Sequence, residues 1–197
     1  MIVENIKSLD KKKVLIITDS GHRFPLYKGE VRKFNIVEGD EVNQIDFSEI
    51  IQVLNKRCKE RALYILERND KTEHELRVKL KSSFYPEDIV DATIEFLKKY
   101  DYIDDCRYAS NYIQTKKNSK SIRQMEYDML AKGISRDIIS DEMQNQKINS
   151  REVIEKILKG RKFNIKSHSK EECNKQIRYL MGKGFLYEEI IAVIKEY

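Results

Sequence analysis

The sequence predicts a mainly α-helical protein of three tandem three-helix modules in an elongated, curved array, behind a small N-terminal β-hairpin leader. A helix-turn-helix phrase occurs at residues 80–89, 129–138 and 180–190, and its copies start 49 and 51 residues apart. Helical repeats of about that length are typical of arrays in which each module packs on the next. Only two Pro and seven Gly, with 36% charged residues, favour long amphipathic helices over a sandwich or barrel. Such arrays hold a partner along a surface and seldom form a deep catalytic pocket.

The leader is the one part with strand signals. Val14–Thr18 is rich in β-branched residues, turn residues follow it, and Arg23–Leu26 is expected to return as an edge strand. A hairpin of this size is not stable alone, so we expect it to pack against the first helix.

The first helix is expected over residues 46–68, because apolar residues recur there at steps of three and four. Asp46 with Glu49 has the spacing of a capping box, and Ile45 with Ile50 that of a hydrophobic staple. The remaining helices come in threes. The predicted segments are a leader at 1–45, module 1 with its long lead-in helix at 46–102, module 2 at 103–147 and module 3 at 148–197.

Cap signals mark several of the later helix ends. Thr72 with Glu75, and Ser169 with Glu172, are spaced as capping boxes. Gly133 suits a left-handed residue after a helix C-terminus.

The net charge of +5 is concentrated in one segment, since residues 147–170 carry eight basic and only two acidic side chains. A solvated helix face is one interpretation. The concentration favours an anionic partner, with nucleic acid first. The basic candidates in this segment are Lys147, Arg151, Lys156, Lys159, Arg161, Lys162 and Lys166. A second candidate patch consists of Lys116, Lys117, Lys120 and Arg123.

Catalytic, metal and membrane functions lack support in the sequence. Cys58, Cys106 and Cys173 are far apart and form no C-x-x-C, which argues against a zinc site or disulfide framework and predicts a reducing cytoplasm. His74 begins a phrase like that of zinc proteases, but Val78 stands where the second His is needed. We therefore expect no enzyme activity, cofactor or metal, and no membrane span.

Two clusters allow both a chemical and a structural interpretation. Asp104 and Asp105 could suggest metal or acid–base chemistry, but neighbouring helix residues point apart and a helix N-terminus favours carboxylates, so capping is expected. Nearby tyrosines could stack on bases, although their helical spacing favours packing between modules. These are Tyr100, Tyr102, Tyr108 and Tyr112.

Several phrases make residues 60–197 resemble the RecX family, bacterial regulatory proteins of the RecA recombinase. Tyr100–Ala109 is similar to the family phrase Gly-Tyr-(Ile/Leu)-(Asp/Asn)-Asp-x-x-(Phe/Tyr)-Ala, and Tyr179–Tyr187 resembles its closing phrase. Further matches are Arg61–Arg68, Glu75–Leu80 and Lys132–Ile134. The sequence departs from the family where Asp101 replaces a usual Gly, where Ser82–Phe84 replaces a Lys-Gly turn, and at Ile122–Glu126.

The resemblance implies a non-enzymatic regulator that binds along the RecA–DNA filament and mostly inhibits its recombinase, ATPase and co-protease activities, in DNA repair and the SOS response. It implies a cytoplasmic protein, expected as a monomer, that meets single- or double-stranded DNA through the filament. The family-motif positions expected to have structural roles are Tyr102, Asp104, Asp105, Tyr108, Gly133 and Gly184.

Two other functions fit the same features. One is a helix-turn-helix DNA reader, although the helices after Pro86 and Ser135 begin with acidic residues that would face phosphates. The other is a helical-repeat scaffold for an unrelated protein partner.

Overall fold

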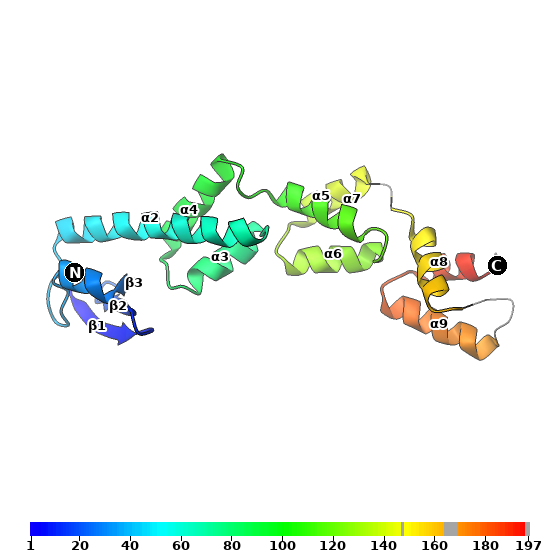
Figure 1. The fold of residues 1–197 in the computed structure, drawn as a ribbon, viewed down its shortest axis with the longest axis horizontal. Coiled ribbons are helices and arrows are strands. Elements are labelled where there is room, and N and C mark those ends of the chain that lie inside the picture. Colours follow the sequence, from blue (N-terminus) through cyan, green and yellow to red (C-terminus); the bar gives the residue numbers. More distant parts are fainter. Residues whose placement is uncertain (147, 164–168, 196–197) are drawn as a thin grey trace. The chain divides into compact units, whose positions relative to one another are not determined.

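The structure, a computed structural model, describes residues 1–146, 148–163 and 169–195, and it divides into two compact units, Met1–Asp104 and Asp105–Tyr197. Figure 1 shows helices along the chain and one small sheet near its N-terminus. The predicted class, mainly helical with a small β leader, is confirmed. No described helix is both long enough and apolar enough to cross a bilayer.

The leader is a three-stranded antiparallel sheet in the order β1-β2-β3. The predicted hairpin is confirmed as β2 (Lys13–Thr18) and β3 (Arg23–Tyr27). The strand β1 (Val3–Ser8) was not predicted, because Val3 is its only buried residue and an edge strand with so little buried surface has a weak alternation signal. The short helix α1 (Lys28–Lys33) was also not predicted.

The sheet and the first helix share one hydrophobic core. Helix α2 (Gln44–Arg68) buries Ile50 and Leu54 in the same cluster as Ile16 and Phe24 of the sheet. The Arg57 side chain adds polar contacts, because its guanidinium donates to Glu30 Oε2 at 2.8 Å and to the Pro25 carbonyl at 2.6 Å. The expectation that the leader packs against the first helix is confirmed.

The predicted start of α2 is wrong by two residues. Asn43 is the N-cap, and its side-chain oxygen accepts a hydrogen bond from the Asp46 backbone N–H at 2.8 Å. Asp46 therefore lies inside the first turn. Ile45 is 75% exposed, so it forms no staple with the fully buried Ile50.

Two further helices complete the packing of the first unit. Helices α3 (Glu73–Lys81) and α4 (Glu87–Lys99) both pack against α2. The capping box of Thr72 and Glu75 is confirmed, with the Glu75 backbone N–H donating to Thr72 Oγ1 at 3.2 Å.

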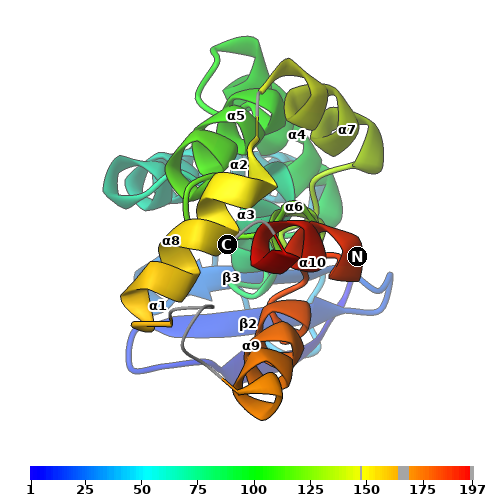
Figure 2. The same ribbon diagram turned by 90° about the vertical axis from the view of Figure 1, so that its right-hand side faces the viewer.

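The second unit contains six helices within its described residues and two separate hydrophobic clusters. The first cluster belongs to α5 (Asp105–Lys116), α6 (Ile122–Ala131) and α7 (Arg136–Asn145). The second belongs to α8 (Ser150–Gly160), α9 (Lys170–Gly182) and α10 (Tyr187–Lys195), where α10 packs against both α8 and α9 (Figure 2). The capping box of Ser169 and Glu172 is confirmed. The division into a leader and three modules stays a prediction.

A left-handed residue ends the first helix of each copy of the repeated phrase. It is Phe84 (φ 65°) in the first copy, Gly133 (φ 80°) in the second and Gly184 (φ 85°) in the third. The next residue is buried each time, as Tyr85, Ile134 and Phe185. The repeated phrase therefore encodes a turn that ends one helix and directs an apolar side chain into the core. The left-handed C-cap predicted at Gly133 is confirmed.

Helices α4 and α8 end in the same kind of turn without glycine. Asp101 has φ 55° and Lys162 has φ 54°. The following backbone N–H bonds back to the helix in both cases, Tyr102 to the Leu97 carbonyl at 2.9 Å and Phe163 to the Leu158 carbonyl at 3.1 Å. Asp tolerates this conformation better than Lys, because its short polar side chain can bond locally.

Replacing Lys162 by Gly should therefore raise the free energy of unfolding by about 0.5–1 kcal/mol, because glycine enters the left-handed region without a Cβ clash. Lys159→Gly removes the same charge in the last turn of α8, where the backbone is helical, and should lower stability by about 0.5 kcal/mol. Urea unfolding followed by circular dichroism measures both variants. A Lys162→Gly variant as destabilised as Lys159→Gly would contradict the assignment of strain to Lys162.

Candidate anion-binding surface

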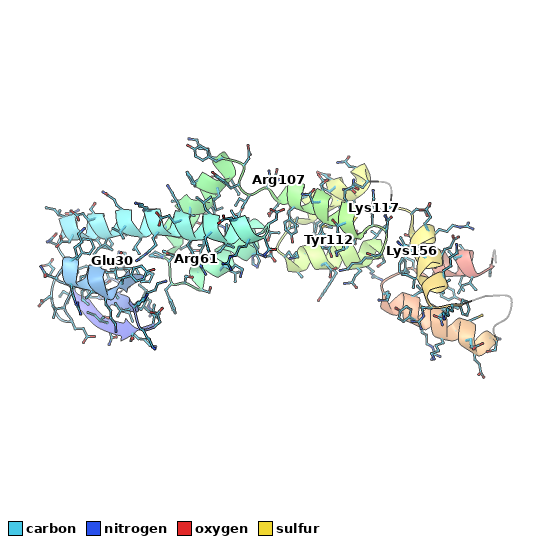
Figure 3. All side chains as sticks on the ribbon, in the orientation of Figure 1. Glu30, Arg61, Arg107, Tyr112, Lys117 and Lys156 are labelled. Carbon is cyan, nitrogen blue, oxygen red and sulfur yellow. The ribbon has the colours of Figure 1, made fainter. Side chains whose placement is uncertain are left out.

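Helix α8 presents the cations of the basic segment on its exposed side. It buries Ile154 and Leu158, while Lys156, labelled in Figure 3, and Lys159 are exposed. Lys162 is exposed just after the helix, and these three lysines form no ion pair within the described part of the chain. The remaining members differ: Arg151 pairs with Glu155 at 3.1 Å, and Lys147 and Lys166 lie outside the described residues.

Arg161 is held by two side chains of α9. Its Nε donates to Gln176 Oε1 at 2.6 Å, and its Cζ lies 3.9 Å from the centroid of the Tyr179 ring. Lys183 Nζ lies 5.2 Å from the same centroid. Tyr179 and Lys183 were not predicted from the sequence as members of this surface. Both lie in the closing phrase, whose basic and aromatic residues could have indicated them.

The second predicted patch is only partly available to a partner. Lys120 Nζ lies 2.5 Å from Asp128 Oδ2 and 3.1 Å from the hydroxyl of Tyr112, which donates to the same Asp128 oxygen at 2.6 Å. The hydrogen bond to Asp128 raises the pKa of Lys120. Lys120, which precedes α6, thus contacts Tyr112 of α5 and Asp128 of α6. Lys116 and Lys117 are half-buried, and Lys117 is labelled at the end of α5 in Figure 3.

Arg123 lies beside the turn that contains Lys183. Ser121 caps α6 by accepting a hydrogen bond from the Gln124 backbone N–H at 3.1 Å, and its hydroxyl donates to the Lys183 carbonyl at 2.7 Å. A Cβ placed on Gly184 would lie 2.8 Å from Ser121 Oγ and 3.6 Å from Arg123 Cβ. This contact between the α9–α10 turn and the start of α6 places Arg123 of the second patch beside that turn.

The family-motif residues have local structural positions. Asp104 immediately precedes α5 and Asp105 is its first residue, so their capping role stays a prediction. Tyr102 is 50% exposed and its ring lies 6.4 Å from that of Phe96 in the same unit. Tyr108 is half-buried, with Lys132 Nζ 5.5 Å from its ring.

No group of three or more His, Cys, Asp or Glu side chains among the described residues is placed to hold a metal ion. The arrangement that remains is a set of exposed cations on α8 and at the α6–α9 contact, suited to binding an anionic surface.

Comparisons with known proteins agree on one family. The family profile described as RecX, first three-helix domain, matches residues 58–97, which span the end of α2 and helices α3 and α4. The regulatory protein RecX of Clostridium beijerinckii is 34% identical, over 97% of this chain and 92% of its own length. That of Clostridium acetobutylicum is 32% identical, over 98% and 95%.

Two crystal structures share the fold. One is of regulatory protein RecX, with a TM-score of 0.63 at 22% identity over 100% of this chain and 99% of that chain. The other is of RecX from Lactobacillus salivarius, with a TM-score of 0.62 at 24% identity over 74% and 97%.

The Lys120–Asp128–Tyr112 group should stabilise the second unit in a pH-dependent way. Burial alone would raise the pKa of Asp128, but hydrogen bonds from Lys120, Tyr112 and Gln124 outweigh it and hold the pKa below its ordinary value. A lowered folded-state pKa adds stability above the unfolded pKa, and this stability is lost as pH falls through the folded pKa.

Asp128→Asn should accordingly lower the free energy of unfolding by about 1 kcal/mol at pH 7. The difference from wild type should shrink below about pH 4, where carboxylates of the unfolded chain are protonated. Urea titrations at several pH values measure it, with Asp141→Asn on the exposed side of α7 as control. A gap that stays constant down to acidic pH would show that the charge of Asp128 contributes nothing.

Proposed function

The chain belongs to the RecX family of regulatory proteins, and we propose that it acts in the cytoplasm as a monomer that binds the RecA–DNA filament and restrains its activities. Family membership over nearly the whole chain supports the choice of filament. The exposed lysines of α8 and its following turn are the structural feature that supports contact with an anionic assembly.

Helical modules suit this role for a physical reason. A filament presents the same binding surface repeatedly, and a chain of small helical modules can touch more than one copy of it. Electrostatic attraction between DNA phosphates and the exposed lysines of α8 would bring the protein to the filament. Restraint of the filament then needs only binding and no chemical step.

A helix-turn-helix reader of duplex DNA is the main alternative. The first turns of α4 and α7 would be the leading ends of its recognition helices, and they carry exposed Glu87, Asp88 and Asp137. Carboxylates there would face DNA phosphates and oppose insertion into the major groove. The scaffold alternative predicts a different protein partner and no effect on RecA.

The protein should slow RecA-driven ATP hydrolysis and strand exchange on single-stranded DNA at a substoichiometric ratio to RecA. A coupled ATPase assay and a fluorescent strand-exchange assay measure these effects. Tight, sequence-dependent binding to duplex DNA without RecA would favour the reader. If both RecA activities stay unchanged while the protein remains folded, the proposed function is wrong.

Removing the exposed cations should weaken binding to RecA–DNA filaments. The triple variant Lys156→Ala, Lys159→Ala and Lys162→Ala should bind about tenfold more weakly, and the slope of log affinity against log salt should fall by about two, because fewer counterions are released. Arg161 is left intact because it packs on α9, so replacing it could change the stability of the protein as well as its binding.

The matched control removes three exposed lysines of the first unit, as Lys11→Ala, Lys56→Ala and Lys79→Ala. These lysines form no ion pair within the described residues, so the net charge changes equally. Fluorescence anisotropy over a salt series compares the two variants. Equal losses in both would mean that net charge, and not the α8 surface, determines the affinity.

A further inference from the structure

We propose that Arg161, Lys183 and Arg123 bind successive phosphate groups of one DNA strand, and that Tyr179 and Ser121 are the residues that position them. The biological ligand in this inference rests on the proposed function, whereas the site itself rests on contacts within the second unit. Lys183 and Arg123 come from different modules, so the site exists only because the α9–α10 turn contacts the start of α6.

Unbalanced charge is the first argument for an anion. Arg161 Cζ and Lys183 Nζ lie 3.9 Å and 5.2 Å from the centroid of one tyrosine ring. The only polar partner of Arg161 within the described residues is the neutral amide of Gln176. Neither cation has a carboxylate partner in the described part of the chain. Two like charges gathered without a counterion repel each other, and the phosphates of a strand bound beside them would offset that repulsion.

The fixed orientation of Arg161 is the second argument. Its Nε is occupied by Gln176, and its flat guanidinium lies against the face of Tyr179. The two terminal amino groups remain, and they form the fork that binds two phosphate oxygens together. Because the ring and the amide already hold this side chain, it loses less conformational entropy on binding than a free arginine would.

The contact at Ser121 gives the site its third member. Ser121 is 3% exposed, and its hydroxyl holds the Lys183 carbonyl at 2.7 Å. The φ of 85° at Gly184 and the 3.6 Å from its ideal Cβ position to Arg123 Cβ place these backbones side by side. Arg123 is exposed and forms no ion pair within the described residues. Cations from two modules thus extend from neighbouring points of the backbone.

A nucleic-acid strand fits this arrangement better than an isolated anion. The exposed lysines of α8 and its following turn continue the positive surface from Arg161, because Lys162 adjoins it in sequence and Lys159 lies in the last turn of α8. A row of cations matches the regular charges of a phosphate backbone. An acidic protein surface is the competing ligand, and the experiment separates the two.

The test measures binding of the full chain to a fluorescein-labelled oligothymidylate, without RecA, by anisotropy over a salt series. Arg161→Ala and Lys183→Ala should each weaken binding about three- to fivefold and reduce the salt slope by about 0.7. Lys195→Ala, an exposed charge on α10 of the same module, is the matched control and should leave affinity near that of wild type.

Tyr179 is tested by a double-mutant cycle. Tyr179→Leu keeps every charge and should weaken binding about threefold, as loss of the cation–π contact with Arg161 predicts. Tyr179→Phe retains the ring and should bind like wild type. In an Arg161→Ala background, Tyr179→Leu should have no further effect, because Tyr179 acts through Arg161. Circular dichroism establishes that each variant is folded.

Three outcomes would overturn the proposal. Arg161→Ala and Lys183→Ala could bind as well as Lys195→Ala, Tyr179→Leu could weaken binding equally with and without Arg161, or polyglutamate could displace the oligonucleotide as well as polyphosphate of equal charge does. Each of these is measured without RecA. A failure here therefore leaves the RecA ATPase result standing, and a failure in the ATPase assay leaves this phosphate site standing.

Discussion

The left-handed turn between paired helices is the constraint on which the rest of this structure depends. At Phe84, Gly133 and Gly184 the backbone has a positive φ, and the next residue enters the core of its module. This geometry ends one helix, satisfies its last carbonyls and sets the direction of the following helix. Each module has few residues with which to form a core, so a turn that buries one more apolar side chain has a large effect on its stability.

The third turn has a second role, because it also contacts the start of α6. Ser121 caps α6 and at the same time holds the Lys183 carbonyl, and the missing side chain of Gly184 allows this approach. The Ser121 hydroxyl therefore both stabilises the start of α6 and holds the turn of Lys183 next to Arg123. The repeated turn explains how each helix pair is joined, and the contact of its third copy with the start of α6 places Lys183 and Arg123 near each other.

The helices from α2 to α10 could be predicted from the sequence, because each has apolar residues at helical spacing and most have a side-chain cap. The strand β1 could not, since it buries only Val3. Charge counting located the α8 surface but treated all its members alike. The stacking of Arg161 on Tyr179 joins the C-cap of α8 to α9, and Lys120 and Asp128 lie eight residues apart. Neither contact leaves a periodic pattern, so only the structure separates the available cations from the ones already paired.

The most direct test of this account is the affinity of Gly184→Ala for RecA–DNA filaments, compared with that of Gly39→Ala. Both glycines have a positive φ, 85° and 87°, but a Cβ at Gly184 would meet Ser121 while one at Gly39 would meet no atom within 4 Å. Both variants should thus suffer similar backbone strain, and only Gly184→Ala should disturb the contact between modules. We expect a fall in affinity of about tenfold for Gly184→Ala, an amount that corresponds to about 1.4 kcal/mol, with little change for Gly39→Ala. Equal affinities in two folded variants would contradict the claim that this contact assembles the binding surface.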